Sequence, residues 1–80
     1  MNTDYLVTMA NDIAAFFASE SGAEAPTSIA SHITRFWDPR MRRQIIDYYH
    51  AKGGAGLTDS SLKAVAILAE QAAKTPTSSH

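Results

Sequence analysis

The residues best suited to recognition lie in one short segment, HITRFWDPRMRR, which spans residues 32–43. It holds four arginines and no lysine, and a guanidinium group makes two-point contacts with carboxylate or phosphate that an ammonium group does not. Arginine beside tryptophan is also typical of the residues that carry most of the binding energy in protein interfaces. The segment therefore predicts a docking surface for a protein partner. The predicted contact residues are His32, Arg35, Phe36, Trp37, Asp38, Pro39, Arg40, Met41, Arg42 and Arg43.

The same segment also has a purely structural interpretation as a tight corner between two helices. Asp38 would cap the second of these helices and Pro39 would be its first residue. Phe36 and Trp37 would then fill the core, and the arginines would form a solvated face. This interpretation accounts for part of the pattern, but the exclusive choice of arginine favours partner contact.

Residues for catalysis or metal binding are scarce. The chain contains no cysteine, which excludes disulfides, thiolate nucleophiles, iron–sulfur ligation and cysteine-type zinc sites. His32, His50 and His80 are far apart in the sequence, and no serine has a base partner at a suggestive spacing. The glycine-rich stretch at 53–56 is not followed by GKS or GKT, so it reads as a helix terminator. We expect no catalytic, cofactor-binding or metal-binding residue.

Charge is unevenly distributed along the chain, although its net value is only −1. Residues 1–34 carry four carboxylates and no Lys or Arg, whereas residues 35–43 carry four arginines against Asp38. The arginine cluster allows an alternative function, a small helical nucleic-acid-binding protein that uses residues 35–43 on phosphates. The net charge and the acidic first segment weigh against it.

Apolar spacing predicts four short helices and no strand, and hence an all-α fold, a small helical bundle. The first should span residues 4–20, with Asn2 or Thr3 as its cap. The second should begin near Pro26 and end at residue 37 or 38, because Pro39 disfavours helical geometry in the residue before it. The third should begin at Pro39.

The glycine-rich stretch ends the third helix, and a fourth helix follows it. Thr58 or Asp59 should cap this helix, and it should end near Lys74, before Pro76. Its spacing predicts an inner face made of Leu62, Val65, Ala66, Leu68, Ala69 and Ala72.

Each predicted helix carries two adjacent bulky apolar residues. Neighbours on a helix diverge by about 100°, so a thin bundle cannot bury both members of every pair. Some members should remain on the surface and form an apolar patch that, with the arginines, docks on a larger protein. The four pairs are Phe16–Phe17, Phe36–Trp37, Tyr48–Tyr49 and Ile67–Leu68.

The size of the chain indicates one small domain. Residues 1–74 should form a single helical domain, and the polar residues 75–80 a flexible C-terminal tail.

Asp4 and Asp12 interrupt the first apolar segment, so it does not read as a signal peptide, and no apolar run is long enough to span a bilayer. We therefore expect a cytoplasmic protein that makes no membrane contact.

Three segments carry a resemblance to a known family: LVTMANDIAAFF at residues 6–17, IASHITRFWDPRMRRQI at 29–45 and GAGL at 54–57. Together they resemble the delta subunit of soluble, molybdenum-containing, NAD-dependent formate dehydrogenases. The similarity covers about residues 4–70, and HITRFWDPRMR is its most specific part. The fourth helix, beyond Leu57, follows the family pattern least clearly.

The resemblance implies an accessory subunit without redox centres or cofactors of its own. In that family the large alpha subunit carries the bis-molybdopterin guanine dinucleotide cofactor and iron–sulfur clusters, and the beta and gamma subunits pass electrons through flavin to NAD. The delta subunit is regarded as serving cofactor insertion or enzyme stability, so the alpha subunit is the expected partner. A narrower hypothesis is that the arginines touch the cofactor phosphates during insertion.

Overall fold

The computed structural model describes residues 2–74, which form four α-helices connected by short turns. The helices are α1 (Thr3–Ser21), α2 (Ala25–Phe36), α3 (Pro39–Lys52) and α4 (Asp59–Lys74), with a short 3-10 helix, η1 (Gly22–Glu24), between the first two. The described range contains no strand, so the predicted all-α fold is confirmed. The tail predicted at residues 75–80 lies outside the described residues.

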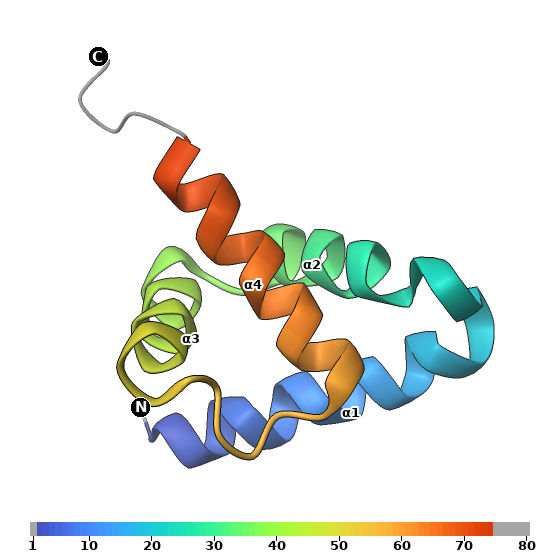
Figure 1. Cartoon of the computed structure of the whole chain (residues 1–80), viewed down its shortest axis with the longest axis horizontal. Helices are drawn as coiled ribbons and strands as arrows, with labels where there is room; N and C mark the ends of the chain where they lie inside the picture. Colours follow the sequence, from blue (N-terminus) through green and yellow to red (C-terminus); the bar gives the residue numbers. More distant parts are fainter. Residues whose placement is uncertain (1, 75–80) are drawn as a thin grey trace.

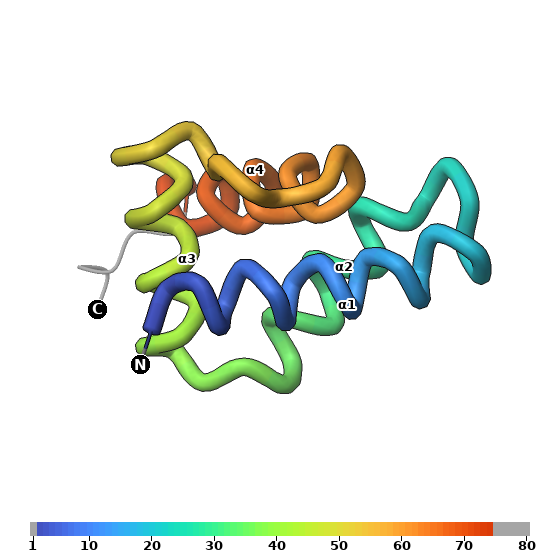
Figure 2. Tube along the Cα trace, turned by 90° about the horizontal axis from the view of Figure 1, so that it is seen from below, coloured from blue at the N-terminus to red at the C-terminus, as the bar shows by residue number. Residues whose placement is uncertain are grey.

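The helices enclose one core rather than lying in a parallel bundle. Helices α1 and α2 run side by side in opposite directions, joined by η1, and α4 crosses this pair on one face (Figures 1 and 2). Helix α3 packs against α1 and α4 at the end opposite η1. None of the helices in the described range is long and apolar enough to cross a membrane.

Local sequence signals determine where the helices begin and end. The Asn2 side chain accepts a hydrogen bond of 2.9 Å from the amide of Asp4, as expected of an N-cap. Asp38 Oδ1 accepts from the amides of Arg40 and Met41 at 2.8 and 3.1 Å. Gly53, at φ 69°, ends α3 in the left-handed conformation that glycine adopts most easily. The predicted boundaries at these positions are confirmed.

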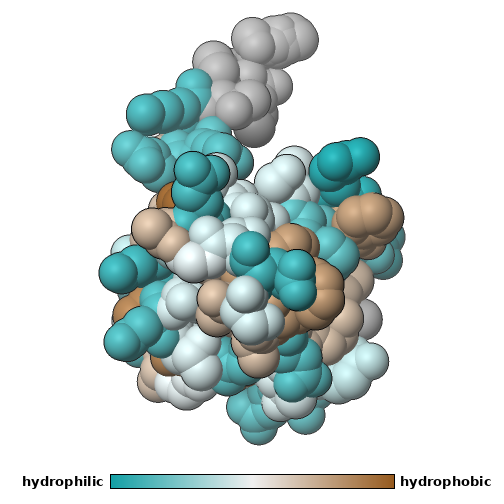
Figure 3. Space-filling view, turned by 90° about the vertical axis from the view of Figure 1, so that its right-hand side faces the viewer, coloured by the Kyte–Doolittle hydropathy of each residue, from teal (hydrophilic) through white to brown (hydrophobic). Residues whose placement is uncertain are grey.

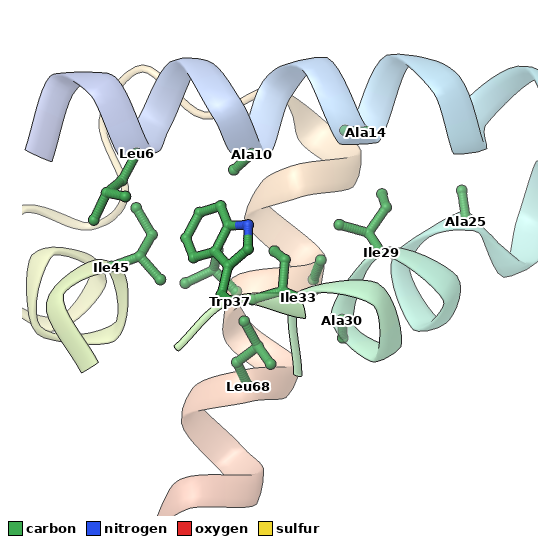
Figure 4. Packing of buried hydrophobic residues seen from close by; sticks show 12 residues of the cluster. Leu6, Ala10, Ala14, Ala25, Ile29, Ala30, Ile33, Trp37, Ile45 and Leu68 are labelled. Atoms are coloured by element: carbon green, nitrogen blue, oxygen red, sulfur yellow. The ribbon is translucent and has the colours of Figure 1, made fainter. Parts of the chain in front are cut away.

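Trp37 lies at the centre of the core, where side chains of all four helices meet (Figure 4). Alanines on α1 keep its inner face thin, so the neighbouring helices approach closely. The buried residues of this core include Leu6, Ala10, Ala14, Ile29, Ile33, Ile45, Val65 and Leu68.

The inner face of α4 differs in part from the prediction. Val65, Leu68 and Ala69 are buried as predicted, together with Ser61 and Ala64, which were not predicted. Leu62 and Ala66 are only half-buried and Ala72 is exposed. The first difference arises because α4 is rotated to bring Ser61 against α1. Ala72 is exposed because the C-terminal part of α4 extends beyond the helices it crosses (Figure 1).

Candidate docking surface

The corner between α2 and α3 is built by two residues that face inward. Trp37 has extended backbone angles, φ −85° and ψ 142°, which end α2, and its side chain is only 5% exposed. Arg42 reaches back from α3, and its Nη1 donates to the carbonyl oxygens of Trp37 and Thr34 at 2.9 and 3.2 Å. A cation suits these carbonyls because they form the negative end of the α2 dipole. Both residues thus have a structural role in the corner.

The remaining arginines point to different surfaces. Arg35 lies at the end of α2, with its guanidinium carbon 6.0 Å from the centre of the Phe36 ring. Arg40 and Arg43 are exposed on α3, where they line a shallow groove of about 410 Å³ with Tyr48 and other residues. Within residues 2–74, none of these three arginines forms an ion pair. The predicted arginine cluster is therefore divided between two helices, and Arg35 lines a different groove from Arg40 and Arg43.

The other predicted contact residues lie at the first turn of α3 or beside the core. Asp38 and Pro39 are exposed at the start of this helix, while Met41 is half-buried against the core. His32 is half-buried on α2, between two phenylalanine rings. The structure fixes where these residues lie, and their contact with a partner stays a prediction.

A continuous row of four rings crosses from α1 to α2. We call Phe16, Phe17, His32 and Phe36 the aromatic row. Successive ring centres are 5.2, 5.7 and 4.7 Å apart, and the first two pairs meet edge to face. Phe16 is 60% exposed and Phe36 is 70% exposed, so the two ends of the row lie open to solvent.

The space-filling view supports an apolar surface in this part of the molecule. Figure 3 looks onto the end where α1 turns into α2 and shows hydrophobic side chains grouped there among hydrophilic ones. The prediction that some paired apolar residues stay exposed is confirmed for Phe16 and Phe36. In the other two pairs, Tyr48, Tyr49 and Ile67 are half-buried, and Leu68 is buried. The residues that sequence reasoning left out of the predicted contact set are Phe16 and Phe17, although the pairing of bulky residues had singled them out.

On the other side of α1, a polar network holds the loop between α3 and α4. Asn11 Nδ2 donates to the carbonyl of Gly56 at 2.9 Å, and Asn11 Oδ1 accepts from the Thr58 amide at 2.9 Å. The same oxygen accepts from the Ser61 hydroxyl at 2.6 Å, and Ser61 is fully buried. We call these four residues the Asn11 network. It satisfies the buried hydroxyl and fastens the loop to α1.

Gly54, in the GAGL stretch, is a packing requirement of the same loop. It is buried at φ 75°, a conformation that side chains other than glycine rarely adopt. A methyl group there would lie 2.5 Å from Leu62 Cδ1 and 3.1 Å from Leu57 Cδ1. The loop is therefore held from both ends, by the Asn11 network and by these two leucines.

Comparison with known families decides what kind of molecule displays this surface. The family described as NADH-dependent formate dehydrogenase delta subunit, FdsD, matches residues 5–65, which is most of the chain. The chain belongs to this delta-subunit family. No curated protein and no solved structure matches it significantly.

Membership in the delta-subunit family makes other formate dehydrogenase subunits the partners of this chain. The matched range includes the aromatic row, the corner and the Asn11 network, and it ends within α4 at residue 65. Within residues 2–74, no three His, Asp or Glu side chains are grouped closely enough to hold a metal ion.

Proposed function

We propose that this delta subunit is a non-catalytic accessory subunit that docks on the large alpha subunit of formate dehydrogenase. It acts in the cytoplasm, and it supports assembly of the enzyme, its stability, or insertion of the molybdenum cofactor into the alpha subunit. The docking surface combines exposed aromatic and arginine side chains around the end of α2.

The observation that carries this proposal is the exposure of Phe36 beside Arg35. Phe36 is 70% exposed, and its ring contacts the His32 ring and lies beside the Arg35 guanidinium. In the free chain, most of its apolar surface is therefore exposed to water, which is unfavourable. A larger subunit that covers the ring removes this surface from water and gains the corresponding free energy. Aromatic and arginine residues are also the types enriched in the energetically important part of interfaces.

The environment of the reactive side chains supports a role without catalysis. The Ser61 hydroxyl is buried and hydrogen-bonded to Asn11 and Thr58, so it is not placed to attack a substrate. The His32 ring lies between the rings of Phe17 and Phe36 and contacts both. These contacts give both residues a structural function in the folded chain.

The division of the arginines weighs against the two phosphate-binding hypotheses. Arg42 is occupied by backbone carbonyls, and Arg35 lies on a different helix from Arg40 and Arg43. On α3, only two exposed arginines, Arg40 and Arg43, are left to bind the phosphates of a nucleic acid or of the cofactor. Docking on a protein uses the apolar rings as well as the charges.

Expression of the complete formate dehydrogenase with and without this chain tests the proposal. Without it, we expect the purified enzyme to contain less molybdenum and to lose subunits more readily, and re-expression of the wild-type chain should restore both. Activity per molybdenum atom should be equal in the two preparations, because the chain takes no part in the reaction. Equal molybdenum content and equal subunit stability in both preparations would contradict the proposal.

A further inference from the structure

A groove between α1 and α2 runs along the aromatic row. It measures about 390 Å³ and is lined mainly by Phe17, Ser28, Ser31, His32, Arg35 and Phe36. Its lining thus combines aromatic rings with small hydroxyl-bearing side chains. Such a surface accepts apolar side chains between the rings, while the hydroxyls receive backbone groups of an incoming segment.

Charged residues of opposite sign lie near the two ends of this groove, and of these only Arg35 belongs to its lining. At the η1 end, just beyond the lining residues, Glu20 follows Phe16 by one helical turn on α1, and Glu24, the last residue of η1, precedes Ser28 by one turn. At the other end stands Arg35, which makes no ion pair within the described part of the chain. All three charged side chains are exposed. A segment that lies along the groove is therefore selected for its direction as well as for its apolar content.

We propose that the groove binds an apolar segment of the large alpha subunit that places a carboxylate against Arg35 and a Lys or Arg near Glu20 and Glu24. This inference rests on the proposed function and names the chemistry that recognises the partner. The carboxylate forms a two-point contact with the guanidinium, which already lies over the Phe36 ring. When the bound segment covers Phe16 and Phe36, it also excludes water from around the carboxylate–guanidinium contact, and this strengthens the attraction between the two charges.

A charge-reversal titration tests the electrostatic part of the proposal. The full chain is titrated against formate dehydrogenase prepared from cells that lack it, first as the wild type and then as Arg35→Glu. The matched control is Lys63→Glu, which makes the same change of charge at an exposed position of α4 outside the groove. We expect Arg35→Glu to weaken binding about tenfold or more and Lys63→Glu to weaken it less than about threefold. Equal effects of the two variants would overturn the proposal.

A photo-crosslinking amino acid at position 36 identifies the occupant. The expected product is a crosslink to a segment of the large subunit that contains apolar residues and an Asp or Glu. A crosslink to a second copy of the chain, to a different subunit, or to a segment without a carboxylate would overturn it. If the wild-type chain bound none of the enzyme subunits, the proposed function itself would fail, whereas binding that is insensitive to Arg35→Glu removes only this inference.

Discussion

The corner and the aromatic row use the same residue types in opposite ways. In the corner, Trp37 fills the core and Arg42 holds the carbonyl groups at the end of α2. One residue earlier, Phe36 is 70% exposed, and Arg35 lies beside its ring. The position at which α2 ends separates the two roles, because Trp37 leaves the helix there and turns inward. Aromatic and arginine residues therefore indicate an interface only when their place on the helix is known.

The largest expected difference between the two regions is in folding stability. Replacing Trp37 by Ala leaves a cavity at the centre of the core, and we expect the free energy of unfolding to fall by about 3–5 kcal/mol. That is a large part of the about 5–15 kcal/mol that stabilises a typical domain. Thermal and urea unfolding followed by circular dichroism measure the loss. A fall below about 1 kcal/mol would mean that the core does not depend on this ring.

The Asn11 network extends the comparison to the opposite side of α1. Asn11→Ala removes one donor and one acceptor that serve Gly56, Thr58 and Ser61, and we expect a loss of about 2 kcal/mol. Asn11→Asp is the matched variant, because its carboxylate keeps the acceptor but lacks the donor to Gly56. It should lose less stability in urea unfolding than Asn11→Ala does. Equal losses would show that the acceptor oxygen contributes little.

Arg42 and Arg43 allow a direct comparison of an inward and an outward arginine. Arg42→Ala removes two hydrogen bonds to carbonyls at the end of α2, so we expect a loss of about 1 kcal/mol. Arg43→Ala should change stability by no more than about 0.5 kcal/mol, because this residue is exposed and forms no ion pair within residues 2–74. Urea unfolding of the two variants in parallel provides the measurement. A larger loss for Arg43→Ala would reverse the assignment.

Local signals in the sequence were sufficient to predict the elements of the fold. Asn2, the Asp38–Pro39 pair and Gly53 each act on backbone groups within a few residues, and the helix ends lie where these residues predict them. The inner face of α4 depends instead on Ser61 meeting Asn11, fifty positions away in the sequence. Helical spacing contains no information about such a contact.

The candidate site was predictable only in outline, for a similar reason. The adjacent bulky pairs predicted that some apolar rings stay exposed, and this is confirmed for Phe16 and Phe36. Which member of a pair faces outward depends on how α2 docks on α1 and α4. The grouping of α1 rings with α2 rings follows from the same docking. The partition of the arginines was missed because Arg42 folds back onto the preceding helix.

The smallest expected effect on stability separates docking from folding most clearly. Phe36→Ala should change the free energy of unfolding by no more than about 0.5 kcal/mol, because most of this ring is already in water. The same variant should weaken association with the other formate dehydrogenase subunits, since its ring is the most exposed large apolar side chain of the aromatic row. Co-purification from cells and urea unfolding of the free chain measure the two quantities on one protein. A variant that keeps both its stability and its association would assign the exposed ring no part in docking, whereas a variant that loses stability would place Phe36 with Trp37 as a residue of the core.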